Sequence, residues 1–414
     1  MANRINVKGS VFLRNGFSAE GQVYLIGAQI GGKLDCEAGT FKNPPQKDAE
    51  GHVVAAAGMA LDADGIKVQD DIFLRNGFSA EGEVRLIGAQ IGGELDCYAG
   101  TFKNPPQKDA EGHAVDGTGE ALVANRINVK GSVFLRNGFS AEGQVCLIGA
   151  QIGGNLFWLG VRNTRGVTLD LRDASVGAVA DDGESWPDPG SLFLDGFNYD
   201  RISAGPIDVE PRLKWLALQP KKPFKPQPYR RLAKVLRESG DNRGARRVLF
   251  EMENQLWLQD KSLLAPVFRW LLRLTVGFGY RPFKILWPWG ALVALGWLFF
   301  GLANHVGMIV PTQSKASNHL AQYHGLPAYY EPFHPLVYSL ENSLPFVKLG
   351  QVDRWQPNPH PHSSASSGSS WNARLRRPFT SPGFLFGFLW AQILFGWLFA
   401  TLFVAGVTGL VRRE

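Results

Sequence analysis

The decapeptide FLRNGFSAEG (residues 12–21) occurs three times in the chain, with copies that begin at positions 12, 73 and 134. The hexapeptide GAQIGG (27–32) recurs at the same interval, so both repeats have a period of 61 residues. A fixed period of this length is the signature of an architecture built by stacking one structural unit on the next.

Short apolar runs, such as INV (5–7), VFL (11–13) and VYL (23–25), alternate with Gly, Asn and Asp inside each unit. Runs this short, rich in β-branched residues and bounded by turn formers, predict strands rather than helices. Regular short strands without intervening helices predict a parallel β-helix, a solenoid, over residues 1–212. We expect about three coils in each 61-residue unit.

Two features of the repeat predict where the coils bend. The glycines of GAQIGG are expected at corners that need a positive φ angle or a close approach between backbones. The segment FKNPPQKDAEGH (41–52, repeated at 102–113) is polar and holds two prolines, so we expect a loop leaving one coil. A looser copy follows at VTLDLRDASVGAV (167–179) and SLFLDGFNYDRI (191–202), which extends the predicted solenoid.

The charges divide the chain into three parts. Residues 1–212 carry 19 basic and 28 acidic side chains, whereas residues 213–284 carry 16 and 5. Residues 285–414 carry only 8 and 4. The basic excess is thus confined to one segment, which argues against a nucleic-acid partner and favours a collar that faces a membrane.

The middle part, 213–284, predicts helices. After a proline-rich linker, the apolar spacing predicts a helical hairpin, with Gly240 as a stop and Asp241 or Asn242 as the next N-cap. The following stretch, 262–284, mixes Trp, Phe and Leu with cations, which is typical of a helix lying in the membrane interface. The cations that we expect to contact anionic headgroups are Arg269, Arg273, Arg281 and Lys284.

Two long uncharged runs predict transmembrane helices at 285–310 and 383–411. At 1.5 Å per residue, the shorter run spans about 39 Å, which exceeds a hydrocarbon core of about 30 Å. The lipid bilayer is therefore an expected partner. The fold class is mixed, with a solenoid followed by a helical hairpin and two transmembrane α-helices.

The expected location is a bacterial inner membrane, with both termini in the cytoplasm and the loop 311–382 outside. The first residues contain no apolar signal-like segment, and three cysteines in 414 residues exclude a disulfide framework. We interpret Cys36, Cys97 and Cys146 as reduced, packed side chains. Arginines at 374, 376 and 377 weaken the positive-inside argument for this orientation.

The loop between the predicted spans holds an amphipathic segment, 331–352, whose apolar residues have helical spacing. A re-entrant or an interfacial helix would fit this pattern. The segment lacks a run of glycines that could present carbonyl groups to an ion, so an external amphipathic cap is favoured over a pore element.

The sequence offers neither a catalytic nor a cofactor-binding constellation, since no dinucleotide, phosphate-loop, metalloprotease or nucleophile-elbow motif is present. A cation site at Asp62, Asp64, Asp70 and Asp71 is disfavoured, because the third repeat replaces these carboxylates with Val123, Asn125, Gly131 and Ser132. We therefore predict no catalytic residue, no cofactor and no metal.

The amino-acid sequences of several segments resemble those of a bacterial family often labelled membrane-associated oxidoreductase. The segments that carry this resemblance are 60–97, 191–202, 228–253 and PLVYSLENSLPFVKLGQ (335–351). The label implies an oxidoreductase, although no catalytic residue transfers with it. The solenoid is also similar, in architecture alone, to bactofilin-type polymerising scaffolds.

Three functions are therefore considered. The residues favour a membrane protein with a cytoplasmic β-helical interaction or scaffold domain. The alternatives are a membrane-associated oxidoreductase and a channel-like oligomer of the two-span chain.

The first coil of the solenoid is expected to support self-association. Its residues match those of an interior coil at 126–135, so nothing in them suggests a cap. An uncapped coil presents unpaired backbone groups to another chain, and we expect Val7, Val11 and Leu13 to form this edge of a homo-oligomer. Coils that precede this chain in a longer protein would cover the same edge.

Overall fold

The structure is a computed structural model of the whole chain. It describes residues 4–44, 58–107, 119–259, 265–275, 277, 282–323, 325–358 and 381–408. These residues form two compact units, which divide between Gln259 and Asp260.

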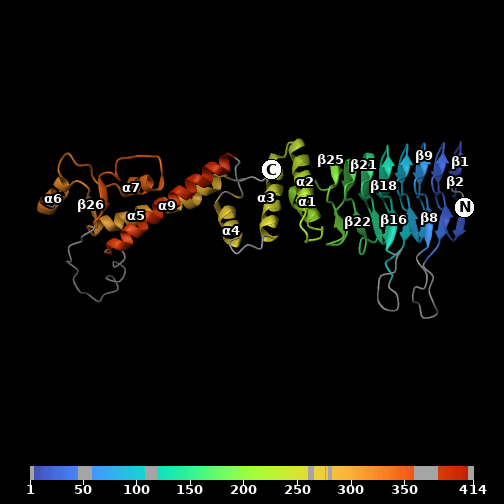
Figure 1. Cartoon of the computed structure of the whole chain (residues 1–414), viewed down its shortest axis with the longest axis horizontal. Helices are drawn as coiled ribbons and strands as arrows, with labels where there is room; N and C mark the ends of the chain where they lie inside the picture. The colour runs from blue at the N-terminus through green and yellow to red at the C-terminus, as the bar shows by residue number, and fades with distance from the viewer. Residues whose placement is uncertain are drawn as a thin grey trace. The chain divides into compact units, whose positions relative to one another are not determined.

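The first unit opens with a right-to-left stack of parallel strands in Figure 1, which confirms the predicted β-helix. The first column stacks β1 (Asn6–Val7), β5 (Gln29–Ile30), β9 (Lys67–Val68), β13 (Gln90–Ile91) and β17 (Asn128–Val129). The second column stacks β2 (Val11–Phe12), β6 (Leu34–Asp35), β10 (Ile72–Phe73), β14 (Leu95–Asp96) and β18 (Val133–Arg136).

Two further columns close the coils. The third column stacks β3 (Ser18–Glu20), β7 (Thr40–Lys42), β11 (Ser79–Glu81), β15 (Thr101–Lys103) and β19 (Ser140–Glu142). The fourth stacks β4 (Val23–Tyr24), β8 (Met59–Asp62), β12 (Glu83–Arg85), β16 (Glu120–Val123), β20 (Gln144–Cys146), β22 (Thr168–Asp170) and β24 (Leu192–Phe193). The first column continues through the longer strands β21 (Gln151–Leu159), β23 (Ser175–Asp181) and β25 (Asn198–Ala204).

The register corrects the predicted number of coils. Val7 pairs with Ile30, and Ile30 pairs with Val68, so successive coils take 23 and then 38 residues. Each 61-residue unit therefore holds two coils rather than three. The second coil is longer because extra residues separate its third-column strand, β7, from its fourth-column strand, β8.

The interior of the solenoid contains a ladder of aromatic rings. Phe17, Phe41, Phe78, Phe102 and Phe139 stack with centroids 5.2–5.3 Å apart, and Trp158 extends the ladder at 5.8 Å. The expectation that 41–52 is wholly a loop is wrong at its start, because Phe41 lies buried in β7. The side chain of Asn43 closes the loop by donating to the carbonyl of Met59 (2.9 Å). Most of the loop, 45–57, lies outside the described residues.

The repeated glycines serve both of the expected purposes. Gly27 adopts a φ of 62°, as its copies Gly88 and Gly149 also do within a few degrees. Gly92 instead lies so close to the preceding coil that a Cβ atom would fall 1.9 Å from the carbonyl oxygen of Gln69. The corner thus requires glycine for two different physical reasons.

Three helices close the far end of the solenoid: α1 (Val209–Leu216), α2 (Gln227–Glu238) and α3 (Asn242–Gln259). The predicted hairpin is confirmed, and the Asp241 carboxylate accepts a hydrogen bond from the N–H of Gly244 (2.8 Å) as an N-cap does. Helix α1 was not predicted. It carries Arg212, which is buried and donates to both carboxylate oxygens of Asp181 (2.6 and 2.7 Å).

The second unit is mostly helical. Its elements are α4 (Ala265–Thr275), the 3-10 helix η2 (Pro282–Ile285), α5 (Leu286–His305), β26 (Ile309–Pro311), α6 (Ser314–Tyr323), α7 (Pro335–Ser343), β27 (Trp355–Pro357) and α9 (Pro382–Val407). The first long helix ends earlier than the predicted 310, because Gly307 takes a φ of 71° and residues 309–311 pair with β27.

Two helices of this unit are long and apolar enough to cross a membrane: Phe283–His305 and Pro382–Val407, with mean hydropathies of 1.7 and 1.9. Unlike the core helices of a water-soluble protein, they leave many apolar side chains uncovered. Trp287 is 84% exposed and Leu394 is 70% exposed.

The glycine corner predicts a stability effect. We expect Gly92→Ala to destabilise a fragment of residues 1–259 by about 1 to 3 kcal/mol, because the new methyl group overlaps the backbone of the neighbouring coil. The free energy of unfolding in urea measures the effect. Gly9→Ala is the control, since its Cβ would meet nothing within 4 Å. A Gly92→Ala variant as stable as the Gly9→Ala variant would contradict this account.

Candidate functional site

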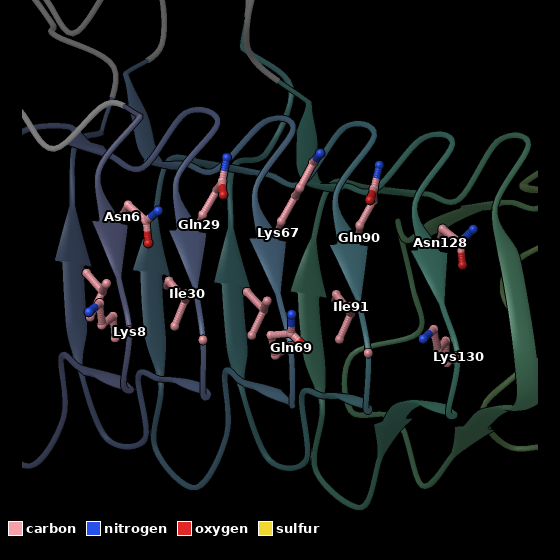
Figure 2. A pocket seen from close by; sticks show the side chains of 14 residues that line it. Asn6, Lys8, Gln29, Ile30, Lys67, Gln69, Gln90, Ile91, Asn128 and Lys130 are labelled. Carbon is pink, nitrogen blue, oxygen red and sulfur yellow. The ribbon is translucent and has the colours of Figure 1, made fainter.

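The first column of the solenoid presents a polar surface that we call the lysine–amide face (Figure 2). Alternate residues of a strand point to opposite faces, so one residue of each pair enters the core and the other points outward. The outward side chains that define this face are Asn6, Lys8, Gln29, Lys67, Gln69, Gln90, Asn128 and Lys130. They line a shallow groove of about 400 Å³.

The three lysines of this face lie on alternate coils but in two rows. Lys8 and Lys130 are in register with Gln69, whereas Lys67 is two residues away along the strand, in register with Gln29 and Gln90 (Figure 2). Lys8, Lys67 and Lys130 belong to the first, third and fifth coils, as the register of their strands shows. Neighbouring strands lie about 4.8 Å apart, so the cations recur about every 10 Å along the solenoid axis. Amide side chains occupy the coils between them, as Figure 2 shows for Gln29 and Gln90.

The composition of the face differs from that of the rest of the solenoid. No acidic, arginine or aromatic residue lines the groove, although residues 1–212 carry an acidic excess. Within the described residues, the amides of Gln29, Gln90 and Asn128 have no hydrogen-bond partner. The face therefore offers free donors, free acceptors and positive charges to an extended anionic molecule.

A cluster of charged residues lies on the fourth column, where it joins the second and third coils. Arg85 donates two hydrogen bonds to the Asp64 carboxylate (2.6 and 3.1 Å). Glu83 is buried beside them, and loss of hydration raises its pKa to about 7. In the described part of the chain, no group of three or more His, Cys, Asp or Glu side chains is placed to hold a metal ion.

The three cysteines are buried and unpaired, as predicted. Burial raises the pKa of the Cys146 thiol to about 12, and it raises those of Cys36 and Cys97 as well. All three therefore remain protonated and inert near neutral pH.

The residues of the predicted collar are only partly described. Lys284 is exposed, and its ammonium group donates to the carbonyl of Arg273 at the end of α4 (3.2 Å). Arg269 is half-buried on the same helix, and Arg273 is exposed. Arg281 lies outside the described residues. The structure thus brings Arg273 and Lys284 together.

The predicted self-association edge lies in the first coil. Val7, Val11 and Leu13 are half-buried there. Their counterparts one repeat pair later, Val129, Val133 and Leu135, are at most 1% exposed because coils cover them on both sides. That a second chain pairs with this edge stays a prediction.

Sequence reasoning missed a polar cluster between the two apolar helices. The hydroxyl of Ser339 in α7 donates to the carbonyl of Val293 in α5 (2.8 Å). The Gln392 amide of α9 donates to the Ser339 hydroxyl (2.7 Å). Because Val293 and Gln392 are mid-helix residues, α7 lies alongside the helix pair. That 331–352 is an external amphipathic cap stays a prediction. The only signal in the sequence was the polar run SLENS (339–343) between two apolar segments.

Comparison with known proteins finds no family model, no curated protein and no solved structure that matches the chain.

The buried Glu83 predicts a pH dependence of stability. A carboxyl whose folded pKa is about 7 rather than 4.5 stabilises the fold below about pH 4.5, and this contribution is lost as the pH rises through 7. We expect Glu83→Gln to stabilise the 1–259 fragment by up to roughly 3 kcal/mol at pH 8 but much less at pH 5.

Urea unfolding at the two pH values measures this difference. Glutamine fits the site, because Gln22 and Gln144 occupy the same position in the other repeats. A stability gain that is equal at pH 5 and pH 8 would show that ionisation of Glu83 is not the cause.

Proposed function

We propose that the chain is an integral membrane protein whose solenoid is a cytoplasmic interaction scaffold. The observation that carries this proposal is the joining of an eight-coil solenoid, which has an uninterrupted polar face, to two exposed apolar helices. In this proposal α5 and α9 cross a bacterial inner membrane, since water would not solvate their uncovered apolar side chains. The basic excess of 213–284 favours the cytoplasmic side for the solenoid.

The partner that best fits the lysine–amide face is an acidic segment of extended polypeptide. Three residues of an extended chain cover about 10 Å, which matches the axial interval between the coils that carry lysines. The amides between them can pair with both the N–H and the C=O groups of such a chain. The lining residues include neither the aromatic rings that stack nucleic-acid bases nor the arginines that bind phosphate in a fork.

The oxidoreductase alternative rests on resemblance alone. Nicotinamide or flavin chemistry requires a phosphate cradle at a helix N-terminus or an equivalent site. Purified protein that carries a bound flavin or nicotinamide spectrum would support that alternative over the scaffold.

The second candidate is a channel-like oligomer of the two-span chain. One observation favours it: the short helix α7 packs beside the middle of α5 and α9 rather than beyond their ends. Ion flux in proteoliposomes that is lost on deletion of 331–352 would promote this candidate.

The lysine–amide face predicts binding of acidic peptides. We expect Lys67→Gln/Lys130→Gln to weaken binding of a fluorescent polyglutamate peptide about tenfold, because each exposed charge pair contributes up to about 1 kcal/mol. Fluorescence anisotropy at low salt measures the affinity. The control is Lys42→Gln/Lys103→Gln, which removes the same charge from the third column. An equal loss of affinity in both variants would mean that the peptide is attracted non-specifically. Binding of a sulfated polysaccharide but not of the peptide would show that the partner is a polysaccharide rather than a polypeptide.

The collar predicts binding to anionic lipid. Replacing Arg269, Arg273, Arg281 and Lys284 by Gln should weaken flotation of a 1–284 fragment with phosphatidylglycerol vesicles, since each cation contributes about 1 kcal/mol at most. Vesicles of neutral phosphatidylcholine are the control. Binding that is unchanged by the substitutions and insensitive to salt would leave 262–284 as a packing element.

A further inference from the structure

Residues 335–355 form a hairpin that enters the second unit beside α5 and then returns. Pro335 lies 3.8 Å from the Cβ position of Gly301, near the C-terminal end of α5. Further along, the ring of Phe346 contacts that of Trp397 at 5.4 Å. The chain then returns to Trp355, which begins β27 beside β26.

The depth of the hairpin follows from the helix residues that it contacts. Residues 343–347 line a cavity together with Leu286 and Trp289 of α5. Gly301 and Trp289 are twelve residues apart, which is about 18 Å along a helix. If α5 and α9 cross a bilayer, as proposed above, the hairpin reaches past the middle of a hydrocarbon core of about 30 Å.

Hydrogen bonds connect the two limbs of the hairpin. The buried Glu341 carboxylate accepts hydrogen bonds from the N–H groups of Gly350, Gln351 and Val352 (3.1, 2.8 and 3.0 Å). This carboxylate fastens the returning limb to α7. The hairpin is therefore a defined structural element rather than an irregular loop.

The tip of the hairpin, unlike its limbs, is exposed and leaves backbone N–H groups unpaired within the described part of the chain. Residues 346–349 are exposed, and Phe346 is 83% exposed. Among the described residues, the N–H groups of Phe346, Lys348 and Leu349 have no hydrogen-bond partner. Irregular backbone at membrane depth is tolerated only where protein buries it or where it lines a water-filled space. An exposed ammonium group at the same place favours water, because a charge in hydrocarbon is costly.

We infer that the hairpin tip, with Lys348, lines a water-filled pathway formed between copies of this chain, and that the pathway admits small anions. A single copy cannot enclose the tip, which is open on its outer side. An apolar cavity of about 620 Å³ between the tip, α5 and α9 leaves room for a neighbouring copy to pack. Symmetric copies would place their lysines in a ring, and rings of cations select anions.

Cysteine labelling of the full chain in lipid vesicles tests the pathway. The native cysteines are buried, so they give little background. We expect Lys348→Cys to react with a charged, water-soluble maleimide roughly 100-fold faster than Leu394→Cys, because a charged reagent enters hydrocarbon poorly. Leu394→Cys is the lipid-facing control. Tyr329→Cys is the water-facing control, because Tyr329 is 72% exposed and belongs to the segment that connects the two long helices in sequence.

The outcomes separate this inference from the proposed membrane insertion on which it rests. Fast labelling at both Lys348→Cys and Leu394→Cys would overturn insertion itself. Slow labelling at both, with fast labelling at Tyr329→Cys, would leave insertion standing and overturn the aqueous pathway.

Flux through vesicles tests the anion preference. The unchanged chain should pass chloride in preference to potassium, and Lys348→Glu should reverse that preference. The matched control is Lys315→Glu, which makes the same charge change in α6, outside residues 335–355. Absence of chloride flux in the unchanged chain, or an equal effect of the two substitutions, would overturn the inference.

Discussion

The solenoid depends on one constraint: a coil can satisfy its backbone and bury its side chains only against the coils on either side of it. The N–H of Gln29 donates to the carbonyl of Ile5, and the N–H of Lys67 donates to that of Ala28, so each coil holds the next. The aromatic ladder and the glycine corners follow from the same spacing, since neither tolerates a shift between coils. Where the stacking ends at β25, the helices α1, α2 and α3 and the buried Arg212–Asp181 pair cover the last coil.

The sequence predicted the fold class because the stacking constraint is local and repeats. It mispredicted the number of coils, because the polar loop that inflates one coil of each pair cannot be told from a coil by composition. Phe41 was assigned to that loop, although its ring belongs to the ladder. The end of the first long helix was also misplaced, since Gly307 and the pairing of 309–311 stop an apolar run that continues to 310.

The candidate sites were harder to predict than the fold. Nothing in the sequence places Lys8, Lys67 and Lys130 on one outward face, because that face appears only when the 23- and 38-residue coils are set in register. The hairpin of 335–355 depends on contacts between residues more than 40 positions apart, such as Ser339 with Val293. The two sites divide between the two compact units, one polar and repetitive, the other apolar and unique.

The 61-residue repeat has a consequence for how this molecule changes over time. Because 61 residues are two complete coils, a gene duplication of that length inserts or removes a coil pair without disturbing the register of those that remain. Residues 2–32 and 124–154 lie 122 residues, or two units, apart and differ at one position, which is the trace that duplication of a two-unit block would leave. Each added unit would lengthen the lysine–amide face by about 10 Å. Recombination can therefore set the reach of this protein in discrete increments while the membrane-facing half stays unaltered.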